Sequence, residues 1–239
     1  MKCAKVIVFY FGSRRIGLNA NIKTDLILSE ILNNEKVDVG FPTDTFFVVN
    51  TAGIPADNCL DKYDGQLTAN GKIRVIKRDN IGISFGGYID IFNQYKHEYD
   101  YWMFLEDDVV VYKEGYIKSF IDELNSSDAT FIALAPISTF IKTHCGGGCG
   151  LTSTKYMERI YNSDFVKLKL DEWAKYSGYD VAAGSLKGKN AEIEFSSHFI
   201  LKNHSSYSPL CVNWSSHSSQ RKFKYLLSPK SEFIYKVGK

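Results

Sequence analysis

Short apolar runs alternate with amphipathic segments from residue 6 to residue 135. The apolar runs are rich in β-branched and aromatic residues, which is typical of buried strands, and the segments between them have helical spacing. The predicted strands cover residues 6–10, 45–49, 73–76, 101–105, 109–111 and 130–135, and the predicted helices cover 24–32, 86–95 and 116–124. Such βαβ units favour a mainly parallel sheet with helices on both faces. The sequence therefore predicts an α/β fold of Rossmann-like type.

Beyond Pro136 the sequence changes in character. Glycine and serine become frequent, and the two further helices predicted, over 153–161 and 191–202, are separated by irregular segments. No repeat and no low-complexity tract interrupts the chain. We therefore expect one domain over residues 1–239, in which the two halves share a core.

Bulk properties exclude several classes of protein. The 29 basic and 27 acidic residues leave a net charge of +2, which is too even for a nucleic-acid-binding face. The apolar run after Met1 is too short for a secretory signal, and no stretch approaches the roughly 20 apolar residues of a membrane-spanning helix. Five scattered cysteines, an odd number, predict reduced thiols rather than a disulfide framework, and the Cys145–Cys149 spacing is a poor zinc motif. A cytoplasmic protein is expected.

The acidic triplet Glu106-Asp107-Asp108 is the most informative segment. Apolar residues on both sides place it at the carboxyl end of a buried strand, where open α/β sheets bind ligands. Three adjacent carboxylates repel one another, and a hard divalent cation, Mn²⁺ or Mg²⁺, would relieve that repulsion. Alternation along an extended chain would point Glu106 and Asp108 to one face and Asp107 to the other. A solvated acidic turn is the alternative interpretation.

With its flanking segments, the triplet resembles the DXD motif of the GT-A glycosyltransferases, in particular the bacterial family 2-like group that builds surface glycans. Three other segments resemble that fold in the same order: Val6 to Tyr10, Phe46 to Gly53, and Arg78 to Gly87. The resemblance covers the first half of the chain well and the second half loosely. It implies a metal-dependent hexosyltransferase that uses a nucleotide-sugar donor. Residues 1–112 would bind the donor, and residues 113–239 would bind a glycan or lipid-linked glycan acceptor.

The resemblance also implies roles for individual residues. Asp108 would be the principal metal ligand, with Glu106 near the ion or the ribose. The donor-binding set would be Tyr10, Asn50, Arg78, Asn80, Gly82, Glu106 and Asp107. The glycines at 82, 86 and 87 would permit close backbone approach at a helix start that faces anionic groups.

An inverting transferase needs a carboxylate to take the proton of the acceptor hydroxyl. Asn190 is a good helix cap, which places Glu192 and Glu194 in the first turn of the predicted helix. Only one of the two can enter a cleft, and Glu192 is favoured because it lies nearer the preceding loop. Ile193, Ile200 and Leu201 are expected on the buried face of that helix. A late histidine, His217, is a candidate metal ligand.

The segment 221–239 interleaves basic and aromatic residues, which suits contact with the inner face of a membrane as much as a solvated terminus. Two other functions stay open. A nucleotidyltransferase acting on a sugar phosphate also joins an α/β fold to metal-binding acids, but Gly12-Ser13-Arg14-Arg15 is a poor version of its glycine-rich signature. A non-catalytic carbohydrate-binding protein could use the many tyrosines and phenylalanines, although such modules rarely contain βαβ units.

Overall fold

The computed structural model describes residues 1–10, 28–50, 58–107, 109–111, 113–134, 145, 148–161, 194–204 and 234–236. Its strands are β1 (Cys3–Tyr10), β2 (Thr43–Asn50), β3 (Ile73–Arg78), β4 (Tyr101–Glu106), β5 (Val109–Val111), β6 (Phe131–Ala133), β7 (Gly150–Ser153), β8 (Leu201–Asn203) and β9 (Ile234–Lys236). The helices are η2 (Asn58–Tyr63), α2 (Ile83–Tyr95), α3 (Tyr116–Asn125) and α4 (Thr154–Ile160), and residues 28–34 are also helical.

Seven strands form one sheet in the order β3-β2-β1-β4-β7-β6-β8. Neighbours pair in parallel except that β7 runs antiparallel to both β4 and β6. This is the mainly parallel sheet that the alternating sequence predicts. A separate two-stranded sheet joins β5 to β9.

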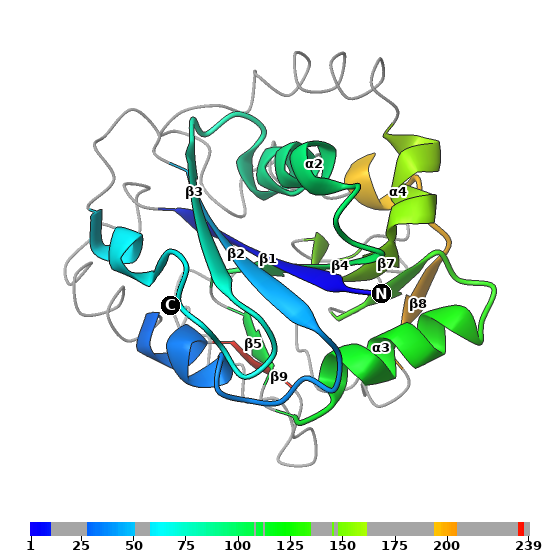
Figure 1. The fold of residues 1–239 in the computed structure, drawn as a ribbon. Coiled ribbons are helices and arrows are strands. Elements are labelled where there is room, and N and C mark those ends of the chain that lie inside the picture. The colour runs from blue at the N-terminus through cyan, green and yellow to red at the C-terminus, as the bar shows by residue number, and fades with distance from the viewer. Residues whose placement is uncertain are drawn as a thin grey trace, which may run out of the picture.

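Helices cover both faces of the sheet (Figure 1), and an apolar layer lies between the sheet and the helices on each face. Along β1, Ile7 and Phe9 join one layer, which includes Leu28 and Ile31 of the helical segment 28–34 and the buried face of α3. Val6 and Val8 join the other layer, which α2 and α4 cover. Alternate strand residues thus face opposite layers, as a sheet buried on both sides requires.

Among the predicted elements that the described residues test, helix 191–202 is the one that the structure overturns. Helical residues occur at 194–196, the chain turns over 197–199, and Leu201–Asn203 forms strand β8. Ile200, which was expected on a buried face, is 62% exposed. The reason is tertiary: Leu201 lies beside Phe131 in a parallel pairing with β6, and this contact overrides the local helical pattern.

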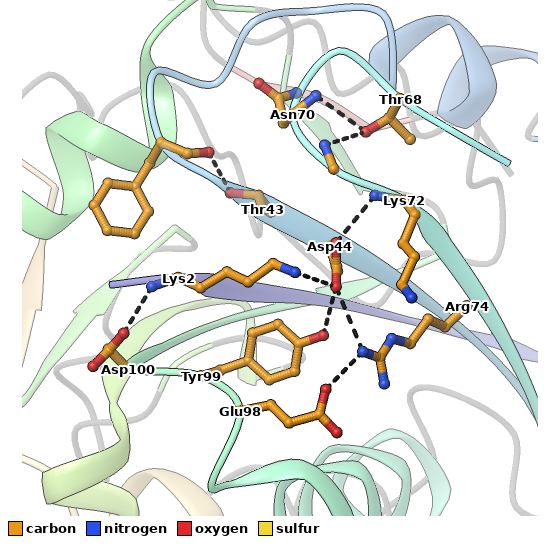
Figure 2. A network of polar contacts seen from close by, with 12 residues as sticks. Lys2, Thr43, Asp44, Thr68, Asn70, Lys72, Arg74, Glu98, Tyr99 and Asp100 are labelled. Carbon is orange, nitrogen blue, oxygen red and sulfur yellow. Dashed lines mark hydrogen bonds and ion pairs between the residues drawn. The ribbon is translucent and has the colours of Figure 1, made fainter. Parts of the chain in front are cut away.

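A buried carboxylate ties together the amino ends of the parallel strands (Figure 2). The Oδ2 atom of Asp44 accepts hydrogen bonds of 2.7 Å from Nζ of Lys2 and from the hydroxyl of Tyr99, and its Oδ1 atom accepts one of 3.1 Å from the backbone N–H of Lys72. Lys2 precedes β1, Lys72 precedes β3 and Tyr99 precedes β4. Burial alone would raise the pKa of Asp44, but these donors outweigh burial and lower it.

Arg74 extends this network along β3. Its Nη2 atom donates a hydrogen bond of 2.6 Å to Glu98 and lies 3.7 Å from Oδ2 of Asp44.

No helix in the described parts of the chain is both long and apolar enough to cross a bilayer.

Candidate functional site

The carboxyl ends of β1, β2, β3 and β4 lie at one edge of the sheet because these strands are parallel. The pairing register places Tyr10, Asn50 and Arg78 in one row across β1, β2 and β3. Glu106 ends β4 opposite Val8, two residues before Tyr10. The structure therefore brings these four predicted site residues to the same edge, where open α/β sheets bind their ligands.

Asn50 and Arg78 contact each other directly. The Nη1 atom of Arg78 donates a hydrogen bond of 2.8 Å to Oδ1 of Asn50, whose Nδ2 atom donates one of 3.2 Å to the carbonyl of Ile83. Arg78 also donates from Nε to Asp90 at 3.1 Å and from Nη2 to the carbonyl of Ile81 at 3.0 Å. The Asn50 side chain is fully buried. The partners identified for both side chains are thus protein atoms.

The loop between β3 and α2 has a constrained backbone. Gly82, which precedes α2, has a left-handed conformation with φ of 76°, and Ile83 has φ of 51°. A positive φ at a β-branched residue is a genuine outlier, and such strain persists only where surrounding contacts impose it. Asn80 in this loop is buried, with 5% of its surface exposed. The strain thus falls in the segment for which donor contacts are predicted.

Two glycines of α2 are required for packing inside the protein. A Cβ atom on Gly86 would lie 1.8 Å from the carbonyl oxygen of Ile81, and one on Gly87 would lie 2.9 Å from Cγ2 of Val8. The close approach expected at these glycines is therefore to the chain's own loop and to β1. Gly86 allows the loop to fold against α2.

The acidic triplet spans the end of β4 and a turn. Glu106 is half-buried, and its Oε1 atom accepts a hydrogen bond of 3.1 Å from Oγ of Ser84 in the first turn of α2. Asp107 is 6% exposed and lies in a turn, so the alternation expected for an extended triplet stops at Glu106. Asp108 lies outside the described residues, and its metal-binding role stays a prediction.

Oxygen donors suit a hard divalent cation, and Glu106 supplies a carboxylate at the carboxyl edge of the sheet. Among the residues that the structure describes, no group of three His, Cys, Asp or Glu side chains could hold a metal ion. Glu106 therefore fits the chemistry of a Mn²⁺ or Mg²⁺ ligand, and the metal site stays a prediction.

The chain returns to this motif near its carboxyl terminus. Strand β9 pairs with β5 in an antiparallel register that sets Lys236 opposite Val109, immediately after the acidic triplet. Part of the basic and aromatic segment predicted as a membrane contact is therefore a strand beside the candidate site.

Of the candidate bases, Glu192 lies outside the described residues, as does the candidate metal ligand His217. Glu194 begins the described helical turn, and Phe195 beside it is 1% exposed. The ring of Phe195 lies 5.2 Å from that of Phe85 and 6.1 Å from that of Tyr161, measured between centroids. Burial, reinforced by the charge of Glu194, raises the pKa of Tyr161 well above its ordinary value. This packing joins the candidate base segment to the first turn of α2.

Gly148 makes that aromatic contact possible. It has φ of 63°, and a Cβ atom there would lie 2.8 Å from Phe85 and 3.2 Å from Phe195. Cys145 and Cys149 nearby are buried free thiols, in agreement with the predicted reduced state. Gly148 thus has a packing role shortly before strand β7, which spans Gly150–Ser153.

Local sequence patterns offer no reason to assign roles to Ser84 and Asp90. Ser84 is a small hydroxyl residue just inside a helix, a position at which its partner on β4 cannot be inferred from local spacing. Asp90 lies twelve residues after Arg78, on a different element, and pairs with it only because α2 packs back across the strands.

The structure is similar to several solved structures. TarS from S. aureus aligns with a TM-score of 0.50 and 15% identity over 87% of this chain and 36% of that chain. TarS 1–349 in complex with UDP aligns with the same score and identity over 87% of this chain and 59% of that one. Mouse xyloside xylosyltransferase 1 in its apo form aligns with a TM-score of 0.44 and 12% identity over 82% of this chain and 81% of that one.

No protein-family model matches the sequence, and no curated protein matches it. The likeness to TarS is a likeness of fold, and it confirms the predicted α/β architecture of GT-A type, with a mainly parallel central sheet flanked by helices. This chain spans less than two thirds of the length of either TarS chain.

Proposed function

We propose that this protein is a glycosyltransferase that moves a sugar from a nucleoside diphosphate donor to a hydroxyl of a glycan or lipid-linked glycan. The observation that carries the proposal is the convergence of Asn50, Arg78 and Glu106 at the carboxyl edge of four adjacent parallel strands. A half-buried carboxylate at that edge, followed by two further acidic residues, suits a cation that grips a diphosphate. That the TarS fragment of similar fold was crystallised with UDP supports a nucleoside diphosphate as the ligand.

Asp108 and Glu106 would hold Mn²⁺ or Mg²⁺, and the bound cation would neutralise the charge that develops on the leaving diphosphate. Ser84 holds the Glu106 carboxylate in place through its hydrogen bond. The loop over 79–82, which precedes the strained Ile83, would lie along the nucleotide and the donor sugar. In an inverting transfer a carboxylate oxygen of Glu192 would accept the proton of the attacking hydroxyl, with Glu194 as the alternative base.

The test is titration calorimetry with UDP in the presence and absence of Mn²⁺, preceded by a thermal-shift screen of nucleotide sugars. We expect Asp108→Ala to abolish the Mn²⁺-dependent part of binding while the melting temperature of the free protein stays close to that of the wild type. Asp122→Ala is the matched control, because Asp122 is an exposed acid on α3 that pairs with Lys118.

Unchanged affinity in Asp108→Ala would contradict the proposal. Release of pyrophosphate from a nucleoside triphosphate and a sugar phosphate would instead identify a nucleotidyltransferase.

A further inference from the structure

A continuous set of polar contacts runs from the middle of α2 to the end of β2. Asp90 on α2 accepts the Nε hydrogen of Arg78, and Arg78 donates from Nη1 to Asn50. Asn50 in turn donates from Nδ2 to the carbonyl of Ile83, the first residue of α2. The planar guanidinium group suits this arrangement because its donors point in fixed directions toward several acceptors.

The backbone that these contacts hold is the strained start of α2. Gly82 and Ile83 are consecutive residues with positive φ, and the carbonyl of Ile83 is the atom that Asn50 binds. Ser84 follows at once, and its hydroxyl holds Glu106. The conformation of residues 82 and 83 therefore determines where the Ser84 hydroxyl lies relative to the acidic motif.

The small exposed fractions of the Arg78 and Asn50 side chains favour a positioning role over direct contact with a nucleotide. The Arg78 side chain is 10% exposed, and its Nε, Nη1 and Nη2 atoms each donate to a protein acceptor. The Asn50 side chain has no exposed surface, and both its amide atoms are bonded to protein. A nucleotide could reach the fully buried Asn50 side chain only by displacing protein groups. The three bonds that Arg78 makes direct its guanidinium toward protein acceptors, and breaking hydrogen bonds to a charged group is costly.

We propose that Arg78 is a positioning residue: acting through Asn50 and Ile83, it holds the left-handed start of α2 so that Ser84 fixes the Glu106 carboxylate. This inference rests on the proposed function only in taking Glu106 as part of the donor site. It replaces the expected contact between Arg78 and the nucleotide with an indirect effect.

A double-mutant cycle between Arg78→Lys and Ser84→Ala tests the proposal. Lysine keeps the charge but cannot reach the three acceptors at once. The measured quantity is the affinity for UDP with Mn²⁺, and we expect each single variant to bind about tenfold more weakly. If Arg78 acts through Ser84, the double variant binds no more weakly than the weaker single variant. Multiplied losses in the double variant would mean that Arg78 acts independently of Ser84, and would overturn the proposal.

Hydrogen exchange in the free protein tests the same idea without a ligand. We expect the backbone amides of residues 83–87 to exchange faster in Arg78→Lys than in the wild type. Unchanged exchange would overturn the positioning role whatever the nucleotide data show. Failure of the wild-type protein to bind any nucleotide with Mn²⁺, combined with faster exchange in Arg78→Lys, would reject the proposed function and leave the positioning role standing.

Arg74→Lys is the matched control. Arg74 also joins two acidic side chains, Glu98 and Asp44, but near the amino ends of the strands. We expect this variant to lower the melting temperature while UDP affinity and the exchange of residues 83–87 stay unchanged. A loss of UDP affinity equal to that of Arg78→Lys would attribute both effects to general destabilisation and would contradict the proposal.

Discussion

The ammonium group of Lys5 lies 2.7 Å from Oε1 of Glu35, and the two side chains are 1% and 6% exposed. Thr45 donates a hydrogen bond of 2.7 Å to the other carboxylate oxygen of Glu35. Burial alone would lower the pKa of Lys5, but attraction by Glu35 and Tyr116 outweighs burial and raises it. Burial raises the pKa of the Tyr116 hydroxyl to about 12. Lys5 therefore keeps its charge at neutral pH inside the layer that α3 covers.

Removing one member of this pair should be costly because it leaves the other charge buried. We expect Lys5→Met to lower the free energy of unfolding by about 3–5 kcal/mol, measured by urea denaturation. The double variant Lys5→Met/Glu35→Leu should lose much less than the sum of the two single variants, since no uncompensated charge remains. A single-variant loss within about 1 kcal/mol of zero would contradict the assignment of a buried ion pair.

Gly86→Ala should disturb the loop that precedes α2. The added methyl group would overlap the carbonyl oxygen of Ile81, so the loop must move or the helix must shift. We expect a loss of about 1–3 kcal/mol in the free energy of unfolding and weaker UDP binding with Mn²⁺. Gly65→Ala is the comparison, because Gly65 has φ of 77° and open space around it. That variant should lose about 1–2 kcal/mol from backbone strain alone and keep its UDP affinity.

His204 forms a buried cluster between β8 and α3. Its Nε2 atom lies 2.9 Å from Oγ of Ser119 and 3.6 Å from Oε2 of Glu123, and its ring stacks on Phe120 with 4.1 Å between centroids. Burial lowers the pKa of His204; Glu123 opposes this shift, and the charges of Lys113 and Lys202 add to it.

Stability should therefore fall on acidification. Between the ordinary histidine pKa of about 6.5 and the lower value in the folded state, the unfolded chain binds a proton that the folded chain does not. We expect the His204 contribution to be complete above that ordinary value and to decline as the pH falls below it, with a slope of at most about 1.4 kcal/mol per pH unit. Urea denaturation between pH 7 and pH 5 measures the slope. His204→Asn should flatten it, whereas His97→Asn, at an exposed histidine, should not.

The membrane hypothesis for residues 221–239 needs a test other than truncation. Deleting the segment removes β9 and leaves β5 without its partner beside the acidic motif. Changing Lys222, Lys224 and Lys230 to Gln instead keeps the β9 sequence intact.

If the segment binds anionic lipid, this triple variant should lose about 100-fold in co-sedimentation with phosphatidylserine vesicles, since each lysine contributes about 1 kcal/mol. The charge-matched control is the triple change of Lys36, Lys62 and Lys118 to Gln. Equal co-sedimentation of the two triple variants would reject the hypothesis.

The strands of the first half could be predicted because each is a continuous apolar run, and β1 to β4 extend the predicted ranges by three residues or fewer at either end. A strand that is buried on both faces is a continuous apolar run, so it can be recognised without knowing which strands lie beside it. Strand β8 could not be found this way, since Leu201 owes its conformation to Phe131, seventy residues earlier. The same limit applies to β9, whose partner lies beyond the reach of any local pattern.

Part of the candidate site could also be predicted. The positions of Asn50, Arg78 and Glu106 at the ends of parallel strands follow from the runs that precede them. The sequence does not show which groups each of these side chains contacts. Arg78 is a conspicuous cation after a strand, but its partners Asp90 and Ile81 depend on how α2 packs and how the loop turns. The roles of Asp108 and Glu192 stay predictions.

Asp44 and Asn50 sit six residues apart on the same strand, which sets them about 20 Å from each other. The Asp44 carboxylate joins the amino ends of four strands, whereas the Asn50 amide lies at the carboxyl edge, where the transfer reaction is proposed to take place. The contacts that anchor the strands and the proposed donor site therefore lie at opposite edges of one sheet. Changes in the loops at the carboxyl edge would alter the substrate preference of the proposed transferase. The hydrogen bonds to Asp44 that hold the amino ends of the strands in register would not be affected.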